Sequence, residues 1–181
     1  SSGLVKAAGG GAWEFVSTQT ASTSSSIDFT NMASGYDYEY WTENMQNGTF
    51  NAGWQSLLGI AGPTYRTSNY HGGIGRVNYG ESQGFESSTT LMLNTTAVGM
   101  GESAGEGLGS SRMTLINPAA SGTKTCWDVK VSYWHDTGSF PLGSWGGGRY
   151  ETAEAHTSIR FQPSSGTVDG GIINQYRRKR S

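Results

Sequence analysis

Polar and hydrophobic residues alternate along much of the chain with a period of two, which is the spacing of a half-buried β-strand. The longest alternating segment is 125–134, in which Trp127, Val129 and Val131 fall on one face and Cys126, Asp128, Lys130 and Ser132 fall on the other. No segment of convincing length has the 3.6-residue period of an amphipathic helix. The pattern predicts strands at residues 13–20, 26–30, 37–43, 50–58, 65–67, 75–79, 89–93, 112–117, 125–134, 159–161 and 172–176.

Connectors rich in glycine, serine and asparagine separate these segments, notably at residues 47–48, 99–111, 121–122 and 143–148. Strands at this spacing without intervening helices predict an all-β fold, an antiparallel β-sandwich of jelly-roll type. The last two strands flank a turn-rich stretch at 163–171, which predicts a closing β-hairpin. We therefore divide the chain into an extended N-terminal arm (1–12), a β-sandwich domain (13–176) and a basic C-terminal tail (177–181).

Composition favours an ordered domain. Aromatic residues make up 12% of the 181 residues and charged residues only 14%, so large rings supply the buried surface while serine, threonine, asparagine and glycine supply the polarity. Neutral polar surfaces of this kind suit assembled particles, because they form hydrogen bonds across interfaces without the cost of desolvating ions. The lone Cys126 is predicted to be a core thiol. The predicted core consists of Trp13, Phe15, Ile27, Phe29, Trp127, Val129, Val131, Ile159 and Phe161.

Charge is distributed unevenly along the chain. The net charge is −2, but Arg177, Arg178, Lys179 and Arg180 carry four of the 12 basic residues, which leaves eight against 14 acidic residues elsewhere. This tail is either a solvated terminus or a segment that binds an acidic neighbouring subunit, and packaged DNA is a less favoured partner. Together with Lys6 in the N-terminal arm, the tail forms the predicted partner-binding set. The chain opens without a signal-peptide pattern and contains no run long enough to cross a membrane, so we expect synthesis in the cytosol.

The sequence predicts no catalytic, metal or cofactor site. His71, His135 and His156 are scattered, and none has a second histidine or a cysteine at metal-ligand spacing, so each is expected to be structural or on the surface. The glycine-rich stretches 72–76 and 99–109 are not followed by helical patterns, which excludes a phosphate loop. Neither a nucleophile turn nor a facing pair of carboxylates is indicated. We therefore expect a protein that is not an enzyme.

Aromatic residues near glycine-rich connectors are the main candidates for a binding surface. Exposed rings could stack on the apolar faces of sugars; alternatively, the same rings plug the ends of the sandwich or fill subunit contacts, which we favour. The candidates are Trp54, Tyr70, Phe140, Trp145 and Tyr150.

Several segments resemble those of small β-sandwich structural proteins of tailed-bacteriophage particles. They are the sequences STQTAS at 17–22, SIDFT at 26–30 and YDYEYW at 36–41, and the C-terminal stretch 159–176 with its Ser164-Ser165-Gly166 turn. The spans 17–41 and 159–176 together make up about a quarter of the chain. Members of that family end soon after the last strand, so residues 177–181 are a departure that favours an anchoring tail.

The resemblance implies a structural protein of the virion, made in the host cytoplasm. The family includes capsid decoration or cement subunits and tail or fibre components. We expect a cement subunit that bridges copies of the major capsid protein or other virion subunits and forms a homo-oligomer, with a trimer favoured. The alternative is a tail or fibre adhesin that binds host-surface glycan, and a hydrolase on the same scaffold is a weaker third possibility. No cofactor, membrane or nucleic-acid partner is expected.

Overall fold

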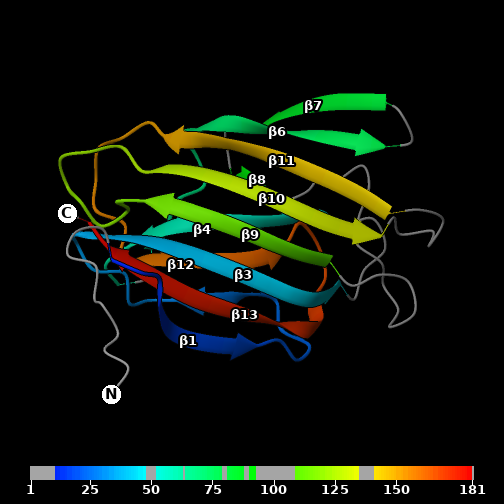
Figure 1. Cartoon of the computed structure of the whole chain (residues 1–181), viewed down its shortest axis with the longest axis horizontal. Helices are drawn as coiled ribbons and strands as arrows, with labels where there is room; N and C mark the ends of the chain where they lie inside the picture. Colours follow the sequence, from blue (N-terminus) through cyan, green and yellow to red (C-terminus); the bar gives the residue numbers. More distant parts are fainter. Residues whose placement is uncertain are drawn as a thin grey trace, which may run out of the picture.

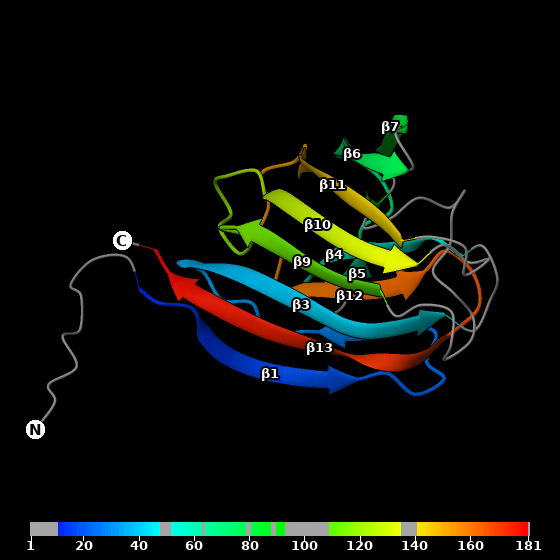
Figure 2. The ribbon, with the colours of Figure 1, turned by 45° about the vertical axis from the view of Figure 1, so that its right-hand side comes forward.

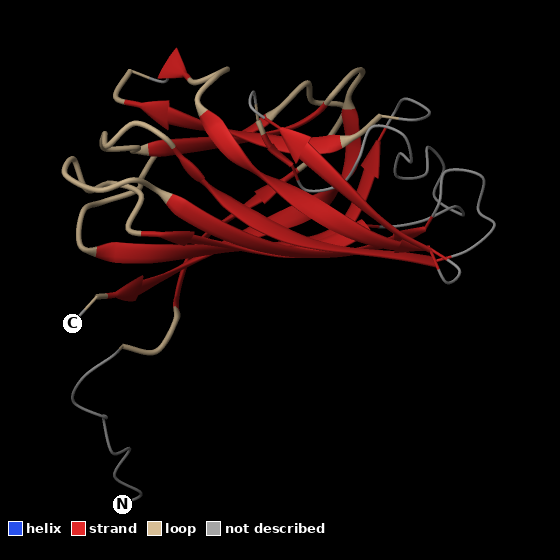
Figure 3. Cartoon of the chain, turned by 90° about the horizontal axis from the view of Figure 1, so that it is seen from above, coloured by secondary structure: helices blue, strands red, loops and turns tan. Residues whose placement is uncertain are grey.

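The computed structural model describes residues 11–47, 52–62, 64–78, 81–87, 90–92, 109–134 and 141–180. These residues form strands joined by loops and contain no helix (Figure 3). Lys6, His135 and Phe140, and most of the predicted N-terminal arm, lie outside the described residues.

Two antiparallel sheets pack face to face, which confirms the predicted all-β sandwich. Figure 1 shows the strands of the larger sheet side by side, and Figure 2 shows strands of the smaller sheet behind them. The larger sheet has the order β1 (Glu14–Thr20), β13 (Val168–Lys179), β3 (Tyr36–Asn47), β9 (Gly109–Ile116), β10 (Cys126–Trp134), β11 (Pro141–Tyr150), β6 (Tyr70–Asn78) and β7 (Glu81–Ser87). The smaller sheet has the order β2 (Ile27–Phe29), β12 (Ser158–Pro163), β4 (Trp54–Ile60) and β5 (Thr64–Tyr65), with β8 (Leu91–Met92) also paired to β4.

The predicted closing hairpin is wrong. Strand β12 pairs with β2 and β4 in the smaller sheet, whereas β13 pairs with β1 and β3 in the larger sheet. The turn-rich connection between them therefore carries the chain from one sheet to the other. Strand β13 also runs through Lys179, so three of the four basic residues assigned to a tail belong to a sheet strand.

Aromatic rings from both sheets fill the space between them. The ring of Phe161 on β12 lies 5.2 Å from that of Tyr40 on β3, 6.1 Å from Phe29 on β2 and 6.3 Å from Trp54 on β4. A buried hydrogen bond from Gln175 Nε2 to the Tyr40 hydroxyl, 3.0 Å long, ties β13 to β3 beside this cluster. These contacts join the two layers into one core.

Seven of the nine predicted core residues are buried: Ile27, Phe29, Trp127, Val129, Val131, Ile159 and Phe161. The prediction is wrong for Phe15, which is 60% exposed, and for the half-buried Trp13. Phe15 lies on the edge strand β1 opposite Tyr176, on the face of the larger sheet that points away from the core. The prediction of a core thiol at Cys126 is also wrong. Cys126 alternates with the buried Trp127 and is half-buried on the face of the larger sheet that points away from the core.

The predicted connector at 143–148 is part of strand β11. One of its glycines, Gly148, is explained by the indole of Trp127, which lies against β11 and β6. A Cβ atom on Gly148 would fall 2.7 Å from Trp127 Cζ2 and 2.6 Å from the Cα atom of Gly72. Glycine here marks the close approach of a ring to the backbone and not a turn.

We expect Gly148→Ala to destabilise the fold by about 1–3 kcal/mol, because its new methyl group would overlap backbone atoms that cannot move aside. Gly143→Ala is a matched control on the same strand, since its Cβ would meet only the Val131 carbonyl oxygen at 4.0 Å. Urea unfolding of both variants checks the prediction, and equal stabilities would contradict it.

Candidate functional site

Three of the five candidate binding aromatics are core residues. Trp54, Tyr70 and Tyr150 are 1%, 3% and 2% exposed, so the packing role holds for them and their rings cannot reach a sugar. The Tyr70 hydroxyl accepts a hydrogen bond from the Leu58 amide at 2.8 Å and donates one to the Arg66 carbonyl at 3.1 Å. Only Trp145, which is 49% exposed, remains available on the surface among the candidates that the structure describes.

The basic C-terminal residues are largely bound within the chain. Arg178 and Arg180 donate hydrogen bonds to the carboxylate of the buried Asp37 at 2.9 and 2.7 Å, and Arg177 donates one to Glu14 at 3.3 Å. Burial alone would raise the pKa of Asp37, but the two guanidinium groups hold it below its usual value. These arginines fasten the end of β13 to β3 and β1. Their predicted partner-binding role, and that of Lys6 and Lys179, stays a prediction.

His156, in the segment between β11 and β12, occupies a closed polar cluster. Its Nδ1 atom lies 2.8 Å from the Thr125 hydroxyl, and its Nε2 atom lies 3.5 Å from Glu154 Oε1. A hydroxyl, an imidazole and a carboxylate in series could activate a nucleophile. Both His156 and Thr125 are 0% exposed, however, so no substrate reaches the hydroxyl. Burial lowers the pKa of His156 to about 4, although Glu154 opposes the shift, and the imidazole is therefore a neutral structural group at pH 7.

Neither a metal site nor a membrane span is found in the described part of the chain. No three histidine, cysteine, aspartate or glutamate side chains there could together hold a metal ion. Those residues also include no helix that is long and apolar enough to cross a membrane.

Exposed hydrophobic side chains gather on one surface, the face of the larger sheet that points away from the smaller one, which we call the outer face. Each of these side chains alternates along its strand with residues buried in the core or lies opposite another outer-face residue. Those identified among the described residues are Phe15, Trp41, Ile116, Trp145 and Ile172.

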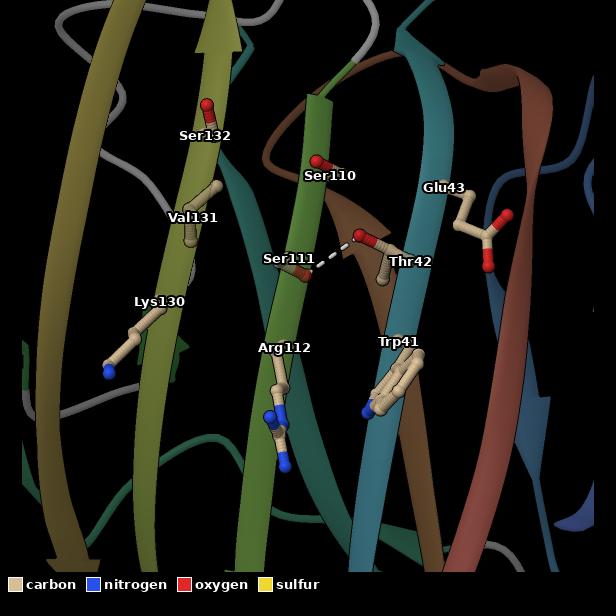
Figure 4. A pocket seen from close by; sticks show the side chains of 9 residues that line it. All are labelled: Trp41, Thr42, Glu43, Ser110, Ser111, Arg112, Lys130, Val131 and Ser132. Carbon is tan, nitrogen blue, oxygen red and sulfur yellow. Dashed lines mark hydrogen bonds between the residues drawn. The ribbon is translucent and has the colours of Figure 1, made fainter.

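A groove of about 480 Å³ runs over β3, β9 and β10 on this outer face. Figure 4 shows Trp41, Arg112 and Lys130 side by side on three neighbouring strands, and the sheet register pairs Trp41 with Arg112 and Arg112 with Lys130. The register continues from Lys130 to Trp145 on β11. We call these four residues the tryptophan row.

Neighbouring side chains hold Trp41 in place at one end of the tryptophan row. The guanidinium of Arg112 lies 5.3 Å from the centre of the Trp41 ring and forms an ion pair with Glu39, which is 1% exposed. On its other side, Trp41 lies 4.9 Å from the ring of Tyr176. The indole of Trp41 is therefore held between a cation and a second ring, which limits its rotation.

Polar side chains border the tryptophan row. Ser110 and Ser132 are opposite one another on β9 and β10, and Glu43 accepts a hydrogen bond from Asn174 at 3.0 Å. Lys130 forms no ion pair or hydrogen bond with any described residue. The groove thus places the ring of Trp41 beside hydrogen-bond donors and acceptors that face solvent, and Trp145 lies next to it on the adjacent strand β11.

Comparisons with known proteins do not assign the chain to a family. No family model matches the sequence, and no curated protein matches it. Among the solved structures that are weakly similar are fructofuranosidase from Schwanniomyces occidentalis complexed with fructose (7% identity, 92% of this chain and 34% of that chain, TM-score 0.23) and A. japonicus CB05 (11% identity, 94% of this chain and 26% of that chain, TM-score 0.27). This chain spans about a third of the length of the first and about a quarter of the second. Similarities at this level do not define a shared fold or function.

The sequence pattern placed the side chains of the groove on the correct faces but did not reveal the groove itself. The alternation predicted that Trp41 and Tyr40 lie on different faces of their strand, and likewise Lys130 and Val129, as the structure has them. Their proximity depends on β9 lying between β3 and β10, which is a long-range pairing. A tryptophan on the polar face of a strand was the available signal.

Proposed function

We propose that this chain is a non-enzymatic structural subunit of a tailed-bacteriophage virion, a capsid decoration subunit that joins neighbouring subunits through the edge strand β1. The resemblance of segments 17–41 and 159–176 to phage β-sandwich proteins supports the class of protein. Consecutive strands alternate between the sheets at β1 and β2, at β3 and β4, and at β12 and β13, which supports the jelly-roll type.

The proposal that β1 forms the assembly surface rests on the position, exposure and composition of this strand. This strand is the outermost strand of the larger sheet in the described part of the chain, and five of its seven residues are exposed. Edge strands usually carry charges or proline that block pairing with another chain. Here Glu14 is the only charged residue, it is paired with Arg177, and the strand contains no proline.

A strand from a neighbouring subunit could add to this edge by backbone hydrogen bonds, which extends the sheet across the joint between the two subunits. Phe15 stands beside that edge, 60% exposed and 5.8 Å from the ring of Tyr176, and would supply apolar contact area. Such a contact would strengthen a shell by burying surface across joints between subunits. The partner is a capsid subunit or a further copy of this chain, and we favour a trimer.

Two measurements test this proposal. Quantitative mass spectrometry and antibody labelling of purified particles should find the chain at many regular capsid positions; a few copies at the tail would favour a tail or fibre component. In a binding assay with such particles, Phe15→Lys should weaken occupancy at least about tenfold, since it places a charge at an apolar contact. Ile116→Lys is the matched control on the same face, because Ile116 is 42% exposed but lies on the central strand β9. Equal losses in both variants, or absence of the chain from particles, would overturn the proposal.

A further inference from the structure

We infer that the tryptophan row, together with the groove that its residues Trp41, Arg112 and Lys130 line, binds a neutral, hydroxyl-rich saccharide chain. This inference does not depend on the virion assignment, because it rests on side chains of β3, β9, β10 and β11 and not on the edge strand β1.

Trp145 offers a flat, exposed stacking surface. Its register partner on β6 is Gly75, and a Cβ atom there would lie 3.4 Å from the indole atoms Cε2 and Cζ2. The missing side chain lets the indole lie against the neighbouring strand, yet 49% of Trp145 remains exposed. A ring supported on one side and open on the other is suited to stacking against the C–H groups of a sugar face.

Trp41 supplies a second stacking surface at the other end of the row. It is 38% exposed although Tyr176 and Arg112 hold it on two sides. Trp41 and Trp145 are separated by three strand-to-strand steps, or about 15 Å. A single sugar cannot contact both rings at that separation, so the arrangement selects a chain of several sugar units running across the strands.

The polar and charged groups of the groove indicate that the ligand is neutral. Lys130 and Arg112 can donate hydrogen bonds, Glu43 can accept them, and the hydroxyls of Ser110 and Ser132 can do both. The charge of Arg112 is already compensated by the buried Glu39, and of the remaining charged groups that line the groove one is negative, Glu43, and one is positive, Lys130. The groove therefore has no excess charge to attract a polyanion, whereas its mixed donors and acceptors match the hydroxyl groups of a neutral saccharide.

A peptide strand is a poorer fit to this position. Strands β3, β9 and β10 are in the interior of the sheet, and each is paired on both of its edges. Their backbone groups are consequently unavailable for strand addition, so a ligand must bind through side chains.

Affinity electrophoresis and isothermal titration of the purified protein test the inference. The probes are four neutral polysaccharides (mannan, dextran, galactan and β-glucan) with their hexamers, and polygalacturonate serves as the anionic comparison. At least one neutral polymer should bind with quenching of tryptophan fluorescence, and its hexamer should bind more tightly than its monomer.

Trp145→Ala and Trp41→Ala should each weaken that binding at least tenfold. Ile116→Ala, which removes an exposed hydrophobic side chain of the same face outside the groove, should leave it unchanged. Circular dichroism establishes that each variant is folded. Lys130→Ala provides a further variant, which alters a solvent-exposed side chain that lines the groove. Failure of every neutral polymer to bind, preferential salt-sensitive binding of polygalacturonate, or an equal loss in Ile116→Ala would each overturn the inference.

Discussion

Replacing Phe161 with alanine will lower the free energy of unfolding by about 3–5 kcal/mol, as expected for a large aromatic side chain in a packed core. Phe161 is 0% exposed, and its ring contacts Phe29 and Trp54 of the smaller sheet as well as Tyr40 of the larger one. The cavity left by the ring would lie between the two layers, where neither sheet can close it without sliding over the other.

Urea denaturation monitored by tryptophan fluorescence measures this loss. Phe15→Ala is the matched control, because it removes the same side chain from a position that is 60% exposed. The control should cost about 1 kcal/mol or less, since it loses mainly the ring contact with Tyr176. Similar losses in both variants would mean that the space between the sheets is not closely packed.

Acidification should remove about 3 kcal/mol of stability through His156 alone, with the loss falling between pH 6.5 and pH 4. Burial lowers the pKa of His156 from 6.5 to about 4 in the folded protein. Within that interval the unfolded chain binds a proton at this histidine and the folded chain does not, so unfolding becomes more favourable as the pH falls. Above pH 6.5 both states are neutral and the full stability is present.

The unfolding free energy of the wild type should therefore decrease more steeply over this interval than that of His156→Gln. Carboxylates with lowered pKa values, such as Glu154 beside Arg66, lose their contribution at still lower pH and are present in both proteins. A direct titration of the His156 ring protons by nuclear magnetic resonance gives an independent value. Parallel stability curves for the two proteins, or a ring titration near pH 6.5, would count against a buried neutral imidazole.

The sequence predicted which side chains of a strand are buried better than it predicted which strands are neighbours. On β10 the period of two identifies Trp127, Val129 and Val131 as core residues because facing the core is a local property of the strand. The pairing of β12 and β13 with strands near the N-terminus is not local, and short loops favoured a hairpin that does not form. The sequence did not predict the exposure of Phe15 for the same reason, because the edge position of its strand depends on the order of all the strands in the sheet.

Glycine was the second source of error. The run Gly146-Gly147-Gly148 was taken to indicate a connector, yet it lies within strand β11, which is paired with β6. Gly148 and Gly72 are opposite one another and make room for the indole of Trp127, whereas a Cβ atom on Gly146 or Gly147 would meet the backbone of a neighbouring strand. Tyr70 and Tyr150 lie opposite one another on the same two strands and are core residues. Their proximity to glycine in the sequence therefore did not indicate a surface loop.

The position of β13 has a consequence for the order in which the molecule can form. This strand lies between β1 and β3, and it pairs Glu14 with Arg177, two residues far apart in the chain. During synthesis, β1 is made before the other described strands, whereas β13, its pairing partner in the larger sheet, is made after all of them. The first strand must therefore wait, with its backbone groups unpaired, until nearly the whole described chain has been made. Such long-range closure is slow and exposes strand edges to other chains during synthesis. We expect the larger sheet to close from its middle outward, with β1 the last strand to be added.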